Sequence, residues 1–344
     1  MRRNLGDEVF ERLIEPFCSG VYAGDPAKLS MKAAFGKVWR LEDTAGSIIA
    51  GSIKALRERS ANPPPPYPAD LPKPVGQTVA SFRRGLATLP LGLAKALGPD
   101  RVKTSWTLTA VARGSDGLYS LSYDTPEGPR SLRSRALVMT LPAHAASPLL
   151  RLPAPPAAEA MDELYYPPVG AVTVAYPETA IRADRLAVGG GKLVGFGQLH
   201  PRSQGVVTLG TIYSSALFPE RCPPGQVLLL NYIGGAKNTN IVNQSAEELT
   251  AQVDKDLRTM LLRPDAPPPR MLGVRVWPRA IPQFNIGHGA VMQKARAALA
   301  ERGWAGAFLG GNYAAGVALG RCVEGAQESA AEVAGWLAGA PVAR

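Results

Sequence analysis

Apolar residues recur at helical spacing in several segments of the chain. Near the N-terminus, the apolar residues from Val9 to Phe17 fall on one face, which predicts an amphipathic helix over residues 1–17. Ser30 is a candidate N-cap for a second helix, because its hydroxyl can accept a hydrogen bond from a free N–H of the first turn. The helices predicted before the C-terminal segment are 1–17, 31–35, 44–60, two helices within 76–98 that break at Pro90, and 244–262.

Apolar runs of strand length lie between these helices, either alternating with polar residues or continuous. In the first half they predict strands over 101–114, 118–125 and 131–142, the last of which ends at Pro142. In the second half the predicted strands are 169–177, 192–201, 206–215, 226–235 and a strand within 271–284. This order of elements predicts a mixed α/β (α+β) fold with a sheet-rich middle.

The segment 308–337 combines the end of a strand, a glycine-rich turn and a helix. Gly310, Gly311 and Gly316 have no Cβ, so the backbone can approach a ligand closely, and helical spacing begins at about Val317. A helix N-terminus that opens on a glycine turn favours a negatively charged or electron-rich cofactor. On the residues alone, an ordinary strand–turn–helix connection fits this segment equally well.

The C-terminal helix is predicted to be amphipathic. Its apolar positions run from Val323 to Leu337, whereas Glu324 and Glu328 lie on the other side and are expected to face solvent. The apolar side is therefore expected to be the packed side.

Composition and charge narrow the class of protein. The 344 residues are 46% apolar and 19% charged, which is a folding composition with room for two domains. The net charge of 38 − 28 = +10 favours solubility, or attraction to acidic surfaces, anionic lipid or a carboxylate-bearing substrate. The basic residues are scattered and not interleaved with aromatics, so we expect no nucleic-acid partner. No apolar run approaches the roughly 20 residues of a membrane span.

The sequence contains no complete nucleotide-binding or metal-binding motif. Cys18, Cys222 and Cys322 are far apart and odd in number, which is typical of a reducing compartment and excludes a CxxC metal pair. Gly195 and Gly287 each begin a GxG pair, but neither pair has the third glycine and following helix of a dinucleotide fingerprint. We therefore predict neither a nucleotide-binding βαβ unit nor a metal site.

Other polar residues have structural interpretations. His144, His200 and His288 are too far apart, on different predicted elements, to form a metal or general-base motif. Glu15 and Asp25 could be a catalytic carboxylate pair, but Asp25 precedes a proline in a turn, which favours a structural role. We therefore predict no catalytic side chain.

Several long phrases, spread over essentially the whole chain, are specific enough to indicate a family. They include GVYAGDPAKLSMKAAFGKVWRLEDTAGSI, YYPPVGAVTVAYP, GFGQLHPR, GVRVWPRAIPQF and FLGGNYAAGVALGRCVEGA. In these phrases the chain resembles the plastid type of oxygen-dependent protoporphyrinogen oxidase, in the flavin monoamine oxidase superfamily. The resemblance implies a monoamine-oxidase-like fold, with an FAD domain built from separated segments beside a substrate domain and a helical membrane-binding domain.

The resemblance also implies a division into domains. Residues 1–32 would be a remnant of the helical membrane-binding domain, 33–72 and 148–276 the substrate-binding domain, and 73–147 and 277–344 the FAD-binding segments. The family's N-terminal GxGxxG segment, which binds the FAD pyrophosphate, and the region with an arginine for a substrate propionate have no counterpart here. We therefore expect an incomplete gene model or a truncated product.

Five residues are implied to bind the cofactor FAD. Val317, Ala318 and Leu319 would lie at the start of the C-terminal helix and face the flavin ring. Trp277 would line the flavin, and Leu108 would contact the adenosine half through backbone atoms. Without the resemblance, Trp277 is better explained as a core aromatic.

Two residues are implied to bind substrate. Phe196 would pack on a pyrrole ring, and Val169 would form the opposite wall of the site. Without the resemblance, a buried core position is again the better explanation of Phe196.

The activity implied by the resemblance is the oxidation of protoporphyrinogen IX to protoporphyrin IX by FAD and O2, with release of H2O2, in haem and chlorophyll biosynthesis. It also implies a plastid location, peripheral membrane association of the full-length protein, and a homodimer. The alternative is a truncated, FAD-free and inactive remnant that binds porphyrin or a partner and exposes apolar surface.

Overall fold

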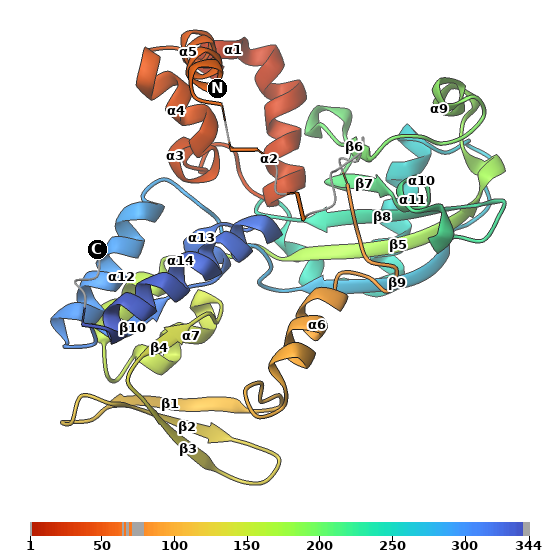
Figure 1. The fold of residues 1–344 in the computed structure, drawn as a ribbon. Helices are drawn as coiled ribbons and strands as arrows, with labels where there is room; N and C mark the ends of the chain where they lie inside the picture. Colours follow the sequence, from red (N-terminus) through yellow and green to blue (C-terminus); the bar gives the residue numbers. More distant parts are fainter. Residues whose placement is uncertain (1, 64, 67–68, 71–78, 340–344) are drawn as a thin grey trace. The chain divides into compact units, whose positions relative to one another are not determined.

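The helices and strands of the computed structural model gather into two compact units (Figure 1). The residues that the structure describes are 2–63, 65–66, 69–70 and 79–339. The units are Met1–Ser52 with Leu164–His288, and Ile53–Glu163 with Gly289–Arg344. Both units combine helices and strands, which confirms the predicted mixed fold.

The first unit contains several short helices and one antiparallel sheet. Its helices are α1 (Arg2–Val9), the π-helix η1 (Phe10–Ile14), α2 (Glu15–Tyr22), α3 (Met31–Ala34), α4 (Gly36–Ala45), α9 (Ala183–Leu186), α10 (Ser214–Leu217) and α11 (Ala246–Met260). Its strands are β5 (Val169–Pro177), β6 (Gly197–Leu199), β7 (Gly210–Tyr213), β8 (Gln226–Gly234) and β9 (Arg270–Trp277). The strand order is β6-β7-β8-β5-β9, and each neighbouring pair is antiparallel.

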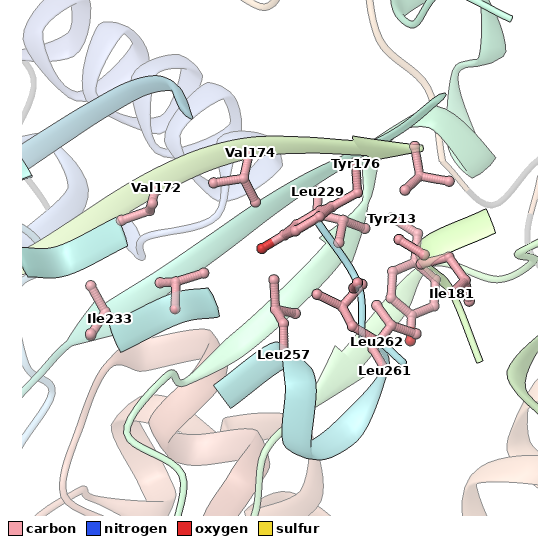
Figure 2. Packing of buried hydrophobic residues seen from close by; sticks show 14 of the residues in the cluster. Val172, Val174, Tyr176, Ile181, Tyr213, Leu229, Ile233, Leu257, Leu261 and Leu262 are labelled. Atoms are coloured by element: carbon pink, nitrogen blue, oxygen red, sulfur yellow. The ribbon is translucent and has the colours of Figure 1, made fainter. Parts of the chain in front are cut away.

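Helix α11 and one face of this sheet form the main core of the first unit. Val172 and Val174 are two residues apart on β5, so both point to the same face of the sheet. Leu229 of β8 lies beside them on this face (Figure 2). Leu257 of α11 and Leu261, the residue directly after this helix, complete this part of the core, and all five side chains are fully buried. Burial of each such side chain stabilises the fold by roughly 1.5–3 kcal/mol.

Ser30 caps α3 as predicted, and the helix predicted over 244–262 begins at Ala246 after a capping box. At α11, the Ser245 hydroxyl accepts from the Glu248 N–H at 3.1 Å, and the Glu248 carboxylate accepts from the Ser245 N–H at 2.7 Å. At α3, the Ser30 hydroxyl accepts from the Ala33 N–H at 3.2 Å. These side chains satisfy first-turn N–H groups that have no partner inside the helix.

The second unit is built from two small sheets and several helices. Its helices are α5 (Ile48–Ala61, which begins in the first unit), α6 (Thr88–Leu97), α7 (Ala143–Leu150), α8 (Pro155–Asp162), α12 (His288–Glu301), α13 (Asn312–Ala315) and α14 (Leu319–Leu337). Its strands are β1 (Thr107–Arg113), β2 (Tyr119–Asp124), β3 (Arg130–Ser134), β4 (Leu137–Met139) and β10 (Ala307–Leu309). The first three form an antiparallel meander, and β4 pairs with β10 in parallel.

The prediction of two helices that break at Pro90 is wrong. Residues 79–87 form turns and irregular backbone, and a single helix, Thr88–Leu97, contains Pro90. Pro90 lies in the first helical turn, where its missing N–H would have no partner in any case. Residues 76–78 and the predicted domain boundary between 72 and 73 lie outside the described residues.

The strand predicted over 131–142 is two strands in different sheets. Arg130–Ser134 pairs with β2, whereas Leu137–Met139 pairs with β10. The break between them is fixed by the Ser134 hydroxyl, which donates to the Ala136 carbonyl at 2.6 Å. The residues before the break are largely exposed and Leu137 is buried, so burial differs sharply within one apolar-looking run.

The predicted N-terminal helix is present but interrupted. Gly6 has φ 82°, outside the helical region, and the turn between α1 and α2 is a π-helix. Of the apolar face from Val9 to Phe17, Leu13 is 62% exposed. This face is therefore amphipathic in pattern but largely uncovered.

Candidate functional site

The glycine-rich C-terminal segment has the predicted order of strand, turn and helix. β10 ends at Leu309, α13 follows Gly311, and Gly316 separates α13 from α14. Gly311 has φ 94° and Gly316 has φ 128°, values that strongly favour glycine. At Gly311 a Cβ would also lie 3.0 Å from the Thr140 carbonyl oxygen. The glycines therefore allow both the turn and its close packing.

The predicted flavin-facing residues stand together at the start of α14. Val317 directly precedes the helix, Ala318 is its N-cap, and Leu319 is its first residue. Leu319 is 53% exposed, and Ala318 is also exposed. Because the alanine N-cap has no side-chain acceptor, the first-turn N–H groups of this 19-residue helix have no side-chain cap. Open backbone donors at a helix N-terminus fit an electron-rich group.

The predicted faces of α14 are confirmed in part: Glu324 and Glu328 are exposed and Val333 and Leu337 are half-buried, whereas the earlier apolar positions are not packed. Val323 is 48% exposed, and the neighbouring apolar positions Ala326 and Ala330 are exposed as well. The helix instead packs through Gly325, which is buried, and through Trp336, whose ring meets Phe308 edge-on with centroids 6.3 Å apart. A small residue and one aromatic thus decide which side of this helix is covered.

Trp277 lies at the end of the edge strand β9. It is 42% exposed, and its backbone partner on β5 is Val169. The guanidinium of Arg275, two residues earlier on the same face, lies 5.8 Å from the centroid of the Trp277 ring. Sequence reasoning missed Arg275, although the period of two along a strand already places it on the face of Trp277.

Val169 is buried in the sheet of the first unit. Its side chain is 5% exposed and packs with Ala23 and Leu209 in a small hydrophobic cluster. The side chain therefore supports the sheet beside Trp277, since Val169 and Trp277 are directly paired.

Phe196 is an exposed aromatic between two glycines at the start of β6. Its side chain is 53% exposed, while its carbonyl accepts from the Tyr213 N–H at 3.0 Å. Gly195 has φ 105° and Gly197 has φ 155°, and a Cβ on Gly197 would lie 2.1 Å from the Thr211 carbonyl oxygen. These glycines shorten the strand predicted over 192–201 to Gly197–Leu199, and they leave the ring available for stacking.

Leu108 is half-buried in β1, in the second unit. It lies opposite Tyr123, and the register of the strand pair shifts between Leu108 and Ala110. The site residues are therefore divided: Phe196, Val169 and Trp277 share the sheet of the first unit, whereas Leu108 and the start of α14 belong to the second.

Glu15 and Asp25, the two carboxylates considered as a catalytic pair, each bind different partners. Glu15 accepts from Arg202 at 2.9 Å, and Asp25 accepts from the Ala27 N–H at 3.1 Å and lies 3.4 Å from Lys237.

The Cys18 thiol is not a reactive group. Burial, and next the Glu15 carboxylate, raise the pKa of the Cys18 thiol to about 11, so the thiol stays protonated.

A hollow of about 510 Å³ lies among the N-terminal helices, and its lining includes Arg3, Trp39 and Glu42. It contains none of the predicted site residues. Among the residues that the structure describes, no three His, Cys, Asp or Glu side chains gather as a metal site. In the same part of the chain, no helix is both long and apolar enough to cross a bilayer.

The chain is similar in sequence to curated proteins that are longer than it is. It is 60% identical over 337 residues to chloroplastic protoporphyrinogen oxidase of Nicotiana tabacum, which covers 98% of this chain and 61% of that protein. It is 26% identical over 355 residues to the chloroplastic/mitochondrial protoporphyrinogen oxidase 2 of Arabidopsis thaliana, covering 94% and 63%. The chain thus spans about six tenths of the length of these curated relatives.

Solved structures show the same fold. A protein from Exiguobacterium sp. 255-15, for which protoporphyrinogen oxidase activity is proposed, superimposes with a TM-score of 0.69 at 24% identity, covering 96% of this chain and 64% of that one. Cyclohexylamine oxidase from Brevibacterium oxydans IH-35A gives 0.52 at 16% identity, covering 95% and 64%. These similarities confirm the predicted monoamine-oxidase-like fold. The model of the flavin containing amine oxidoreductase family matches residues 1–336, and the chain belongs to that family.

Proposed function

We propose that the chain is part of a flavin-dependent oxidase that converts protoporphyrinogen IX to protoporphyrin IX in plastids. The observation that carries this proposal is the 60% identity, over 98% of the chain, to the chloroplastic tobacco enzyme. The proposed cofactor is FAD, and the proposed oxidant is O2, which is reduced to H2O2.

The start of α14 supports the flavin part of the proposal. Its N–H groups lack a side-chain cap, and Val317, Ala318 and Leu319 surround them with small or exposed apolar groups. These residues would hold the electron-rich edge of the flavin ring, with Trp277 and Leu108 as further contacts. FAD held by these residues would supply two-electron redox chemistry, with the porphyrinogen as the proposed hydride donor and O2 as the proposed final oxidant.

The residues of the first unit would orient the macrocycle. Phe196 offers an exposed ring held by its own backbone hydrogen bond, and Val169 supports the sheet beside Trp277. Aromatic and aliphatic groups suit a flat apolar macrocycle. The contribution of these side chains would be binding and orientation, not proton transfer.

We further propose that the N-terminal helices contact a membrane surface in the full-length protein, as expected of residues 1–32. Leu5, Val9, Leu13, Phe17 and Val21 recur every fourth residue and are each between 37% and 62% exposed. Such a stripe on a chain of net charge +10 fits an anionic bilayer surface. Residues 33–72 with 148–276 and 73–147 with 277–344 remain the proposed substrate and FAD segments.

Absorbance spectroscopy of the purified chain tests the function. We expect flavin bands, a change in the Soret band of added protoporphyrin IX, and about ten-fold weaker porphyrin binding in Phe196→Ala. Porphyrin binding without flavin would favour the FAD-free alternative. Absence of both signals in a folded protein would contradict the proposal. Sedimentation velocity checks the proposed homodimer.

A further inference from the structure

A chain of hydrogen bonds, buried at its Asp256 end, joins α11 to Phe196, the residue directly before β6. It begins at Asp256, which is 3% exposed. The Asp256 Oδ2 accepts from the Val207 N–H at 3.0 Å, from the Thr208 N–H at 2.7 Å and from the Thr208 hydroxyl at 2.6 Å. The Asp256 Oδ1 accepts from the Gln252 amide at 2.9 Å. A buried carboxylate with four donors fixes the segment at Thr208 firmly.

His200 continues the chain, and its neighbours determine its tautomer. The imidazole is 3% exposed, and its Nδ1 lies 2.8 Å from the Thr208 carbonyl oxygen. Because a carbonyl only accepts, Nδ1 must carry the proton and donate. Burial is the largest influence on the pKa of His200 and lowers it. The ring is therefore neutral at pH 7, and Nε2 is left as an acceptor.

Gln198 links His200 to the β7 strand. Its side-chain nitrogen lies 3.2 Å from the His200 Nε2, which can only accept, so the amide nitrogen must donate there. This assignment leaves the Gln198 Oε1 free to accept from the Tyr213 hydroxyl, which lies at 2.8 Å. The Tyr213 N–H in turn donates to the Phe196 carbonyl at 3.0 Å. From the Tyr213 hydroxyl to the Thr208 carbonyl, the side-chain hydrogen bonds therefore run in one consistent direction, and the Tyr213 backbone adds a separate bond to Phe196.

The strand at the end of this chain needs such support. β6 has three residues and lies at the edge of the sheet, so its backbone has one neighbouring strand. Gly195 and Gly197 flank Phe196, and each adopts a positive φ that residues with a Cβ rarely adopt. Backbone pairing alone therefore leaves the direction of the Phe196 ring weakly determined.

We propose that the chain Asp256–Thr208–His200–Gln198–Tyr213 sets the position of the Phe196 ring, with His200 and Gln198 as positioning residues. This inference rests on the proposed function for its purpose, since Phe196 is the proposed porphyrin platform. The hydrogen bonds that carry the inference do not depend on bound porphyrin. Through this chain, the packing of α11 determines the shape of the proposed substrate site.

Two amide variants of His200 separate positioning from stability. In His200→Gln the longer side chain reaches the place of Nε2 and can accept from Gln198, whereas in His200→Asn the shorter one reaches only the place of Nδ1. Both variants lose the imidazole. Gln198→Leu breaks the same link from the other side. Gln204→Leu is the matched control, because Gln204 is exposed on a nearby turn.

The experiment uses 4-fluorophenylalanine at position 196, read by ¹⁹F NMR, and titration of each variant with protoporphyrin IX. We expect His200→Asn and Gln198→Leu to shift or split the fluorine resonance and to weaken porphyrin binding about five-fold, the effect of one lost hydrogen bond. Gln204→Leu should resemble the parent protein, and His200→Gln, which keeps the acceptor for Gln198 but loses the bond to Thr208, should change both signals less than His200→Asn.

Identical behaviour of His200→Asn and His200→Gln, or an unchanged fluorine resonance in Gln198→Leu, would overturn the inference. If the parent protein fails to bind protoporphyrin IX while the resonance follows the expected pattern, the proposed substrate is wrong and the positioning chain stands. Thermal unfolding of each variant shows whether a change in the resonance reflects global loss of structure.

Discussion

At the scale of single residues, a glycine allows the close backbone approach beside which Phe196 lies. Gly197 lets β6 pass directly beside the Thr211 carbonyl, where a Cβ would lie at 2.1 Å. The exposed Phe196 ring depends on this close approach. The alternation of apolar and polar residues did not predict this close approach, since the pattern around Phe196 predicts a strand of ordinary length over 192–201.

Gly197→Ala should therefore destabilise the protein by about 2 kcal/mol, from the backbone clash and the unfavourable φ. The measurement is urea unfolding. Gly273→Ala on β9 is the control, because no atom lies within 4 Å of a Cβ there. A loss of stability in Gly273→Ala equal to that in Gly197→Ala would contradict the steric explanation.

His200 gives stability a defined dependence on pH. Burial lowers its pKa in the folded state, so the unfolded chain binds a proton first as pH falls below about 6.5. Stability from this group is complete above that pH and is lost as pH falls toward the folded-state pKa. Unfolding free energies between pH 8 and 5 should fall less steeply in His200→Gln than in the parent protein.

At the scale of elements, sequence predicts best where a signal is local. The caps at Ser30 and Ser245 lie within four residues of the groups they bond, and both helices begin there. The packed face of α14 depends on distant partners such as Phe308, and here the apolar pattern holds in the last turns of the helix but fails at Val323. The break between β3 and β4 likewise depends on distant partners, because β3 pairs with β2 and β4 pairs with β10 in another sheet.

The N-terminus of α14 provides a test in which stability and binding change in opposite directions. Ala318→Asp adds a side-chain cap and a negative charge, so we expect about 1 kcal/mol of added stability. The same charge should weaken FAD binding about five-fold, because it opposes the electron-rich ring. Ala318→Asn adds the cap without the charge and should stabilise while weakening binding less. Equal flavin affinity in all three proteins would argue against this site.

At the scale of the whole molecule, resemblance predicted more than physical pattern did. Long phrases such as GFGQLHPR indicated the family and hence the fold, which periodicity alone left as mixed α/β. The site residues were also taken from resemblance, and their roles remain predictions. The hydrogen-bonded chain that ends at Phe196 could not be predicted, because Asp256 lies 48 residues from Thr208 in sequence and only folding brings the two together.

The basic charge and the exposed apolar stripe predict binding to anionic vesicles. Leu13→Glu should weaken that binding about ten-fold, because it replaces an apolar anchor of roughly 1.5–3 kcal/mol with a repelled charge. Co-sedimentation with vesicles of mixed neutral and anionic lipid measures the effect. Leu152→Glu, at a position 94% exposed and outside the stripe, is the control. Equal losses in both variants would point to charge alone.

The first unit is assembled from two stretches of chain, and this has a consequence for its synthesis. The Gln283 amide donates to the Tyr22 carbonyl across 261 residues of sequence, and Leu29 forms a bridge with Asn285. At about 5–20 residues per second, a ribosome needs roughly 13–52 s to make that interval. During this time Tyr22 and Leu29 are on the growing chain without these two partners. The contacts between the N-terminal segment and residues 283–285 therefore form only after nearly the whole first unit has been synthesised, which makes closure of this unit a late step of its folding.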